Sequence, residues 1–283
     1  MYRHPYFDLW LHSDAELVAQ LGSAVQSRTT VHEWPLSCVQ RLSLADGRRY
    51  IYKAQAAPTV EPDFYAVARS PLLVKARLLD TPTGPAALLL DHLDAPHLAD
   101  LHLPAAGALR IGEAVLAQIA AIEGDLPASA DIRTEALWGE YFREVLAELT
   151  ALVEGGTFRQ VDRALVARLA RQSEAPAVLA AFRTPVGYLH RDLTGDNLFV
   201  LPEGYRLIDW QRPFYGPVLL DLASILQALG VDPLDHLPSG IGQLRLLLSI
   251  AWYAQCARRW FPFGAETYDA AIVRLAAQLF QAA

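Results

Sequence analysis

One short segment, residues 188–200, constrains this chain more than any other part of it. It reads YLHRDLTGDNLFV, so that His190, Asp192 and Asn197 stand between two apolar runs typical of short strands. Asp209 follows twelve residues after Asn197, at the end of a further apolar run. The segment therefore predicts a small β island whose edges carry a cluster of polar side chains.

The choice of residue types supports a special role for two positions. The chain has 24 basic residues, and of these only Lys53 and Lys75 are lysine. Asn197 is the only asparagine. In a chain that uses Arg so heavily, a position that keeps Lys or Asn is a candidate for a specific function.

The pattern of apolar and polar residues changes from strand-like to helical near residue 91, which predicts an α+β protein with two lobes. The length of 283 residues fits two lobes, since a domain takes roughly 150 residues. The first part is rich in strand patterns and the second part is mostly helical. The predicted division is an N-terminal β lobe, residues 1–91, and a larger helical lobe, residues 92–283.

The elements expected in the β lobe follow from local signals. Ser13 and Glu16 have the spacing of a capping box, which predicts a helix over 14–26. Asp46-Gly47 predicts a tight hairpin turn, because glycine supplies positive φ angles. The other predicted elements are strands at 39–44, 48–53, 72–79 and 86–90 and a helix at 62–69.

Apolar residues at helical spacing predict the elements of the second lobe. Trp138, Phe142, Val145, Leu149 and Leu152 form the clearest stripe, which is more typical of a helix core than of a substrate site. Further helical stripes are Ile111 to Ile122 and Val161 to Leu169, and the tail 219–283 is predicted to be helical.

Several motifs, taken together and in order, resemble the protein-kinase-like fold, in the branch of small-molecule kinases that includes aminoglycoside phosphotransferases and choline kinases. The resemblance rests on Lys53, Glu61-x-x-Phe-Tyr65, His190-x-Asp-x-x-x-x-Asn197, Ile208-Asp-Trp210, Gly216-Pro217 and Asp221-Leu-Ala223. It implies a bilobal fold with a small antiparallel β lobe and a mostly helical lobe. It also implies an enzyme that transfers the γ-phosphoryl group of ATP or GTP to a hydroxyl of a small molecule.

The resemblance also implies roles for the polar residues. Asp192 is the expected catalytic base, which orients the acceptor hydroxyl and takes its proton. Asn197 and Asp209 are the expected Mg²⁺ ligands, because hard oxygen donors suit that ion. Lys53 is expected to contact the α- and β-phosphates, and Glu61 to hold Lys53 in place. His190 is expected to be structural, with a hydrogen bond to the loop.

Three further residues are expected to contact the adenine. Ile51 lies two residues before Lys53 and therefore on the same strand face, where it could cover the ring. Phe199, two residues after Asn197, could form the floor of the site. Leu93, in the connector after Asp91, would present backbone groups to the adenine edge.

The sequence departs from the family pattern in the phosphate loop. Such loops usually carry glycine, because the backbone must approach the phosphates closely. The expected place here is Glu33–Cys38, which has no glycine, so that Ser37 is the candidate phosphate ligand through its hydroxyl and backbone N–H.

Other interpretations of the same residues stay open at this level. Asp192 and Lys53 could be solvated surface charges, Asn197 a turn residue, and Glu33 a rival of Glu61. A nucleotide-binding scaffold without turnover is the alternative function, supported by the glycine-free loop. A protein kinase is disfavoured, since only eleven residues separate Asp209 from Asp221, too few for a regulated activation loop.

Composition limits the partners and the location. The formal net charge of -7 argues against non-specific nucleic-acid binding and against docking on an anionic membrane. Two cysteines give no disulfide framework or zinc spacing, which fits a reduced, cytoplasmic setting. Composition and motifs leave the oligomeric state open.

The acceptor is expected to bind to the helical lobe, within 131–172 and 240–283. The acidic net charge fits a cationic acceptor, such as an aminoglycoside or an amino alcohol. The candidate acidic residues are Glu140, Glu144, Asp162 and Asp269, for which a solvated helix face is an equal explanation.

Overall fold

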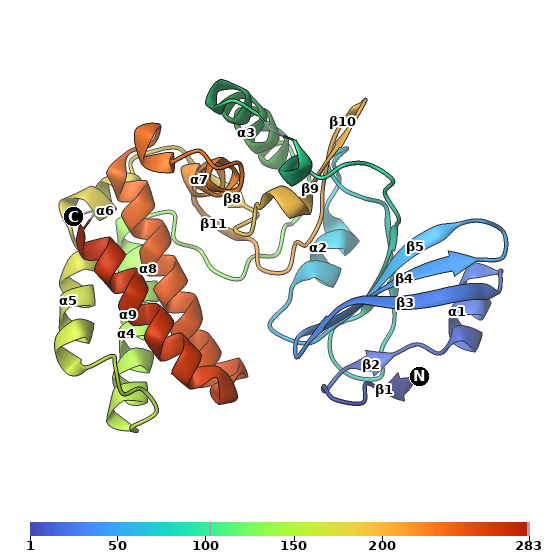
Figure 1. Ribbon diagram of the computed structural model, residues 1–283, viewed down its shortest axis with the longest axis horizontal. Helices are drawn as coiled ribbons and strands as arrows, with labels where there is room; N and C mark the ends of the chain where they lie inside the picture. The colour runs from blue at the N-terminus through green and yellow to red at the C-terminus, as the bar shows by residue number, and fades with distance from the viewer. Residues whose placement is uncertain (102, 282–283) are drawn as a thin grey trace. The chain divides into compact units, whose positions relative to one another are not determined.

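The computed structural model describes residues 1–101 and 103–281, and the parts of the predicted helical lobe at 102 and 282–283 lie outside the described residues. The chain forms two compact units, each made of separate stretches of sequence (Figure 1). Unit 1 comprises Met1–Leu103, Ala117–Ser129 and His190–Pro213. Unit 2 comprises Pro104–Leu116, Ala130–Leu189 and Phe214–Ala283. The functional division at residue 91 stays a prediction.

Unit 1 is built on an antiparallel sheet of five strands in the order β3-β4-β5-β7-β6. The strands are β3 (Val25–Trp34), β4 (Ser37–Leu44), β5 (Arg49–Gln55), β6 (Ala76–Leu79) and β7 (Ala87–Asp91). Two further strands, β1 (Tyr2–Arg3) and β2 (Trp10–Leu11), pair with each other. The predicted small antiparallel β region is confirmed.

The two faces of this sheet differ because side chains alternate along each strand. On one face Leu42, Tyr52 and Leu89 are buried in a hydrophobic core. Helix α1 (Asp14–Leu21) contributes Leu17 and Leu21 to the same core. The opposite face carries the odd-numbered residues of β4 and β5, which include Lys53.

Helix α1 begins as predicted and ends earlier. The capping box is present: the Ser13 hydroxyl accepts from the Glu16 N–H at 3.3 Å, and the Glu16 carboxylate accepts from the Ser13 N–H at 2.8 Å. The predicted extension to residue 26 is wrong, because Gly22 adopts a left-handed φ of 70° and β3 starts at Val25.

Two other predictions for this unit need correction. The turn at Asp46-Gly47 spans four residues between β4 and β5, and of these only Gly47 has a positive φ, so that it is no tight two-residue turn. The predicted strand 72–79 is reduced to β6. Its first part is held instead by a hydrogen bond from the Leu207 N–H to the Leu72 carbonyl, 2.9 Å long.

Unit 1 contains the second half of the predicted β island, whereas the strand predicted at 186–189, β8 (Val186–Leu189), pairs with β11 (Phe214–Pro217) in unit 2 and not with the rest of the island. Strands β9 (Leu198–Leu201) and β10 (Gly204–Leu207) pair in antiparallel register. The remaining elements of this unit are α2 (Glu61–Val67) and the 3₁₀ turns η1 (Leu98–Asp100) and η2 (Gly195–Asn197).

Unit 2 is mostly helical. Its helices are α4 (Glu135–Glu154), α5 (Arg163–Ser173), α6 (Pro176–Ala181), α7 (Leu219–Ala228), α8 (Ser239–Gln255) and α9 (Ala265–Gln281), while α3 (Ala105–Ala120) belongs partly to each unit. Short elements are η3 (Pro233–Asp235), the π-helical turn η4 (Cys256–Trp260) and η5 (Pro262–Gly264). Strands β8 (Val186–Leu189) and β11 (Phe214–Pro217) form an antiparallel pair.

The core of unit 2 confirms the predicted stripe on α4. Trp138, Phe142, Val145, Leu149 and Leu152 are all buried in one hydrophobic cluster with residues of α8 and α9. The Trp138 indole N–H donates to the Ser173 carbonyl at 3.0 Å, so that its polar atom is satisfied inside the core. The stripe is structural, as the sequence indicates.

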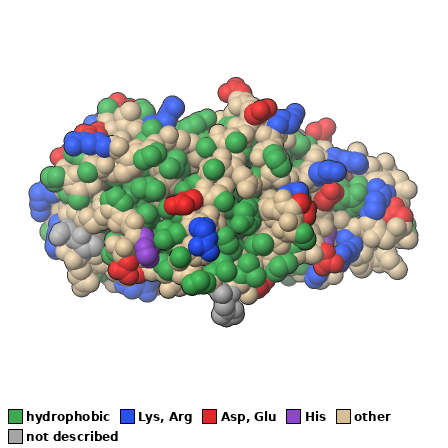
Figure 2. Space-filling model, turned by 90° about the horizontal axis from the view of Figure 1, so that it is seen from above, with side chains coloured by type: hydrophobic (Ala, Val, Ile, Leu, Met, Phe, Trp, Pro, Cys, Tyr) green, Lys and Arg blue, Asp and Glu red, His purple; other side chains and the backbone are tan. Residues whose placement is uncertain are grey.

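The surface carries charges of both signs. On the face shown in Figure 2, Lys and Arg side chains are interspersed with Asp and Glu among hydrophobic side chains. Within residues 1–101 and 103–281, none of the helices has both the length and the apolar character needed to cross a bilayer.

Candidate active site

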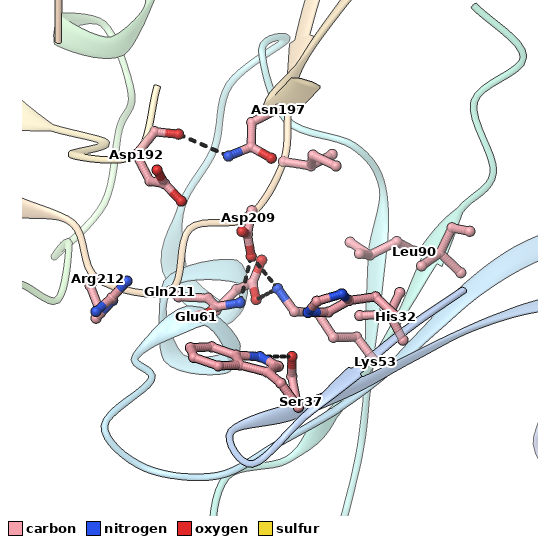
Figure 3. A pocket seen from close by; sticks show the side chains of 14 residues that line it. His32, Ser37, Lys53, Glu61, Leu90, Asp192, Asn197, Asp209, Gln211 and Arg212 are labelled. Carbon is pink, nitrogen blue, oxygen red and sulfur yellow. Dashed lines mark hydrogen bonds and ion pairs between the residues drawn. The ribbon is translucent and has the colours of Figure 1, made fainter. Parts of the chain in front are cut away.

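Fourteen side chains, all from unit 1, surround a cavity of about 280 Å³. They are His32, Trp34, Ser37, Val39, Ile51, Lys53, Glu61, Leu90, Asp192, Asn197, Ile208, Asp209, Gln211 and Arg212. Figure 3 shows that the charged side chains of the sheet, of α2 and of the segment after β10 point toward one another around this space. The structure thus brings together Asp192, Asn197, Asp209, Lys53 and Glu61, as the sequence predicts.

The sheet register explains which side chains reach the cavity from the β strands. His32 of β3 lies opposite Val39 of β4, which in turn lies opposite Lys53 of β5. One row further along, Ile51 lies opposite Leu90 of β7. Because alternate residues share a face, Ile51 and Lys53 both line the cavity.

Lys53 is the centre of a charge cluster in which Lys53 and Glu61 are buried and Asp209 is half-buried. Its ammonium donates to the Glu61 carboxylate at 2.6 Å and forms a second ion pair with Asp209. Glu61 also accepts from the backbone N–H of Trp210 at 3.0 Å, and the Gln211 amide donates to Asp209 at 2.6 Å. The predicted partnership of Lys53 with Glu61 is therefore present, and Glu33 is exposed and does not line the cavity.

The pKa values within this cluster follow from burial and from the charges nearby. Burial alone would lower the pKa of Lys53, but the carboxylates of Asp209 and Glu61 outweigh it and raise that pKa. Burial raises the pKa of Glu61, with Lys53 acting against it. Burial opposes the charged form of Asp209, yet Lys53 lowers its pKa below the ordinary value. Lys53 and Asp209 are therefore both charged at neutral pH.

Two non-glycine residues of the site have left-handed backbone. Arg191 has a φ of 72° and Asp209 a φ of 70°. Such conformations cost of order 1–3 kcal/mol each and concentrate at functional sites. Here they turn the chain next to Asp192 and at Asp209 itself, which aims both carboxylates at the cavity.

The loop that carries Asp192 is fixed by its neighbours. The Asn197 side-chain amide donates from Nδ2 to the Asp192 backbone carbonyl at 2.8 Å. The Oδ1 atom of Asn197 takes no part in that hydrogen bond. The His190 ring donates from Nε2 to the Ile208 carbonyl at 2.9 Å, and burial lowers its pKa. His190 is thus a neutral, hydrogen-bonded residue, in agreement with the structural role predicted for it.

A tight turn replaces the glycine-rich loop. Trp34 and Ser37 lie opposite each other at the ends of β3 and β4, with only Pro35 and Leu36 between them. The Trp34 indole N–H donates to the Ser37 hydroxyl at 2.6 Å, and Ser37 is buried beside the cavity. Side chains, rather than glycine backbone, therefore face the cavity at this end.

Two of the residues expected at the adenine are not among those that line the cavity. Phe199 packs against the His97 ring with centroids 4.1 Å apart, and Leu93 is half-buried in the connector. Their adenine contacts stay predictions. Conversely, sequence reasoning missed His32, Trp34, Val39, Leu90, Ile208, Gln211 and Arg212.

The donor set of the cavity fits a hard divalent cation. Asp209 offers two carboxylate oxygens, of which Oδ1 accepts from Lys53 and Gln211. The Asn197 amide uses its nitrogen for the Asp192 carbonyl, which leaves its oxygen as a donor to a metal. Oxygen donors of this kind suit Mg²⁺.

Comparison with a protein-family model shows to which family the chain belongs. Residues 60–264, well over half of the chain, match the model of the phosphotransferase enzyme family. The chain belongs to this family. The predicted recognition is confirmed, and with it the prediction that the protein is an enzyme of the small-molecule kinase class. Among curated protein sequences no match is found.

Solved structures show the same fold at low sequence identity. A spectinomycin phosphotransferase in complex with ADP and spectinomycin is 14% identical, with a TM-score of 0.54, 96% of this chain covered and 100% of that chain. A choline/ethanolamine kinase family protein from Mesorhizobium loti is 15% identical, with a TM-score of 0.64 and 95% and 92% covered. An aminoglycoside 2′-phosphotransferase variant in its GDP complex is 10% identical, with a TM-score of 0.61 and 94% and 96% covered. The predicted protein-kinase-like α+β fold is confirmed.

Proposed function

We propose that this protein transfers the γ-phosphoryl group of ATP or GTP to a hydroxyl of a small molecule, with Mg²⁺ as cofactor. The observation that carries the proposal is the convergence of Lys53, Glu61, Asp192, Asn197 and Asp209 on one cavity. Phosphoryl transfer requires positioned groups and neutralised charge rather than covalent chemistry by the protein. A family of phosphotransferases and an ordered set of such groups both fit this reaction.

On this proposal the sheet side of the cavity binds the nucleotide. Lys53, held by Glu61, would give its ammonium to the phosphates. Ser37 would add a hydroxyl, and the apolar side chains Val39, Ile51 and Leu90 suit the flat face of a purine. One structural relative is a complex with ADP and another a complex with GDP, so that ATP and GTP are both possible phosphoryl donors.

Asp192 would act on the acceptor. Its loop is fixed by Asn197 and by the neutral His190, so that its carboxylate can accept a hydrogen bond from the acceptor hydroxyl. The proton of that hydroxyl would pass to Asp192 as the oxygen attacks the γ-phosphorus. Asn197 and Asp209 would hold Mg²⁺, which neutralises phosphate charge when it is bound.

The acceptor is proposed to be an alcohol such as an aminoglycoside or an amino alcohol. Relatives of the same fold include a spectinomycin phosphotransferase and a choline/ethanolamine kinase family protein. Two of the four acidic candidates for acceptor binding have other tasks: Asp162 caps α5 through the Leu165 N–H at 2.7 Å, and Asp269 is buried. Glu140 and Glu144 on α4 remain as candidates.

An acceptor screen tests the function. The protein is incubated with Mg-ATP or Mg-GTP and with aminoglycosides, choline-like alcohols, sugars or amino acids, and release of nucleoside diphosphate is measured. We expect one acceptor class to stimulate release, and Asp192→Asn to reduce the stimulated rate by about 100-fold or more, the usual size of a lost general base. Equal background for the wild type and Asp192→Asn across the whole panel would contradict the proposal.

A further inference from the structure

A second positive charge, that of Arg212, faces the same cavity as Lys53. Among the described residues that line the cavity, these two carry a permanent positive charge. Lys53 is engaged by Glu61 and Asp209 on the sheet side. In Figure 3, Arg212 and Asp192 lie on one side of the cavity, whereas Lys53, His32 and Leu90 lie on the other. The two cations therefore lie on different sides of the cavity.

The backbone around Arg212 is held in place on both sides. The Gln211 carbonyl accepts from the Val60 N–H at 3.0 Å, and the Arg212 carbonyl accepts from the Ser129 hydroxyl at 3.2 Å. The Pro213 carbonyl accepts from the Ser129 N–H at 2.7 Å. Pro213 also restricts Arg212 to extended conformations. These contacts fix the backbone from which the Arg212 side chain reaches the cavity.

The chemistry at this end of the cavity calls for such a charge. The loop from Asp192 to Asn197 reads DLTGDN and contains no basic residue. A phosphoryl group that moves toward Asp192 would meet two carboxylates, those of Asp192 and Asp209, at the point where its own oxygens carry negative charge. A guanidinium suits this task, because its fork of N–H donors can bind two phosphate oxygens at once.

We propose that Arg212 is a catalytic residue that binds the γ-phosphoryl group on the acceptor side of the cavity. The proposal rests on the proposed function. In the step it assists, the bond between the γ-phosphorus and the bridging oxygen breaks, and the acceptor oxygen forms the new bond to phosphorus. The acceptor proton goes to Asp192, and the nucleoside diphosphate leaves with the bridging oxygen. Arg212 contacts the γ-oxygens throughout, whereas Lys53 serves the α- and β-phosphates.

The test compares binding of a triphosphate with binding of a diphosphate and needs no acceptor. Isothermal titration in Mg²⁺ measures the Kd of a non-hydrolysable ATP or GTP analogue and of ADP or GDP. The variants are Arg212→Gln and Arg212→Lys, and the matched control is Arg206→Gln, which removes a half-buried arginine of the same unit that does not line the cavity. The melting temperature of each variant is measured alongside.

The expected result is selective. Arg212→Gln should weaken the triphosphate analogue about 10-fold or more, the size of a lost charge-assisted contact, and leave the diphosphate within about 2-fold. Arg212→Lys should retain part of the triphosphate affinity, and Arg206→Gln should match the wild type. Equal weakening of both nucleotides, or no change in either, would overturn the assignment of Arg212. If Arg212→Gln does not fold, Arg212→Lys decides by the same triphosphate-to-diphosphate ratio. A wild type that binds neither nucleotide would instead overturn the proposed function.

Discussion

Each unit of the molecule holds carboxylates with little or only partial exposure, and the main partners of those carboxylates differ between the units. In unit 2, Asp269 of α9 accepts three backbone N–H groups, those of Arg159, Gln160 and Val161, at 2.7 to 2.8 Å. In unit 1, Glu61 and Asp209 share the single ammonium of Lys53. The first arrangement fixes a loop, while the second gathers charges on a cavity.

The difference separates a structural carboxylate from one that can serve chemistry. Three N–H donors use the acceptor capacity of Asp269 on neighbouring backbone, and the side chain is only 3% exposed. Asp209 faces a cavity, and its carboxylate forms an ion pair with Lys53, whose ammonium could also bind a phosphate. Burial alone therefore does not identify a functional acid. Glu61 also accepts a backbone N–H, and what distinguishes Glu61 and Asp209 from Asp269 is their ion pair with Lys53 at the edge of a cavity.

The first prediction concerns the structural carboxylate, Asp269, and has the largest expected effect. Asp269→Asn should lower the free energy of unfolding by about 3 kcal/mol, because an amide cannot accept all three hydrogen bonds and places its own N–H groups against backbone donors. Urea denaturation followed by circular dichroism measures the change. Nucleotide affinity of the folded variant should stay at the wild-type value. A stable Asp269→Asn with weakened nucleotide binding would show that Asp269 is no purely structural acid.

The second prediction concerns unit 1 and has a smaller effect. Burial lowers the pKa of His12, His92 and His190 below the ordinary value of 6.5. The unfolded chain therefore takes up protons first as the pH falls, and the free energy of unfolding should decrease below pH 6.5. Denaturation between pH 7.5 and pH 5 measures this slope.

A variant sharpens this prediction. His190→Gln places an amide N–H near the position of Nε2, from which it can donate to the Ile208 carbonyl, but does not titrate, so its stability should depend less on pH than that of the wild type. Stability that rises as the pH falls, or an identical slope in both proteins, would contradict the neutral state assigned to His190.

The sequence predicts the charged half of the site well. The resemblance to small-molecule kinases implies that Glu61 holds Lys53, and the structure places the two side chains 2.6 Å apart. Asp192 lies in the loop after β8, Asn197 in η2 and Asp209 two residues after β10, and all three line one cavity with them. These residues are predictable because they stand in ordered motifs that resemble those of small-molecule kinases.

Other parts of the site depend on how the chain turns, which periodicity does not reveal. Phe199 stands two residues after Asn197 and is expected to form the floor of the site, but Asn197 lies in the 3₁₀ turn η2 and Phe199 in β9, so that strand alternation does not connect the two. Gln211 and Arg212 reach the cavity because the chain turns sharply at Asp209, whose φ is 70°. Neither residue belongs to a repeating pattern that would indicate its direction.

The account depends most directly on metal-dependent nucleotide binding at this cavity. Isothermal titration should show that the wild type binds ATP or GTP with Mg²⁺ and loses most of that affinity in excess EDTA. Asn197→Ala and Asp209→Ala should lose the Mg²⁺-dependent part, about 10-fold or more in Kd, while Asp269→Asn keeps it. Equal nucleotide affinity in the wild type, Asn197→Ala and Asp209→Ala, with and without Mg²⁺, would contradict the account.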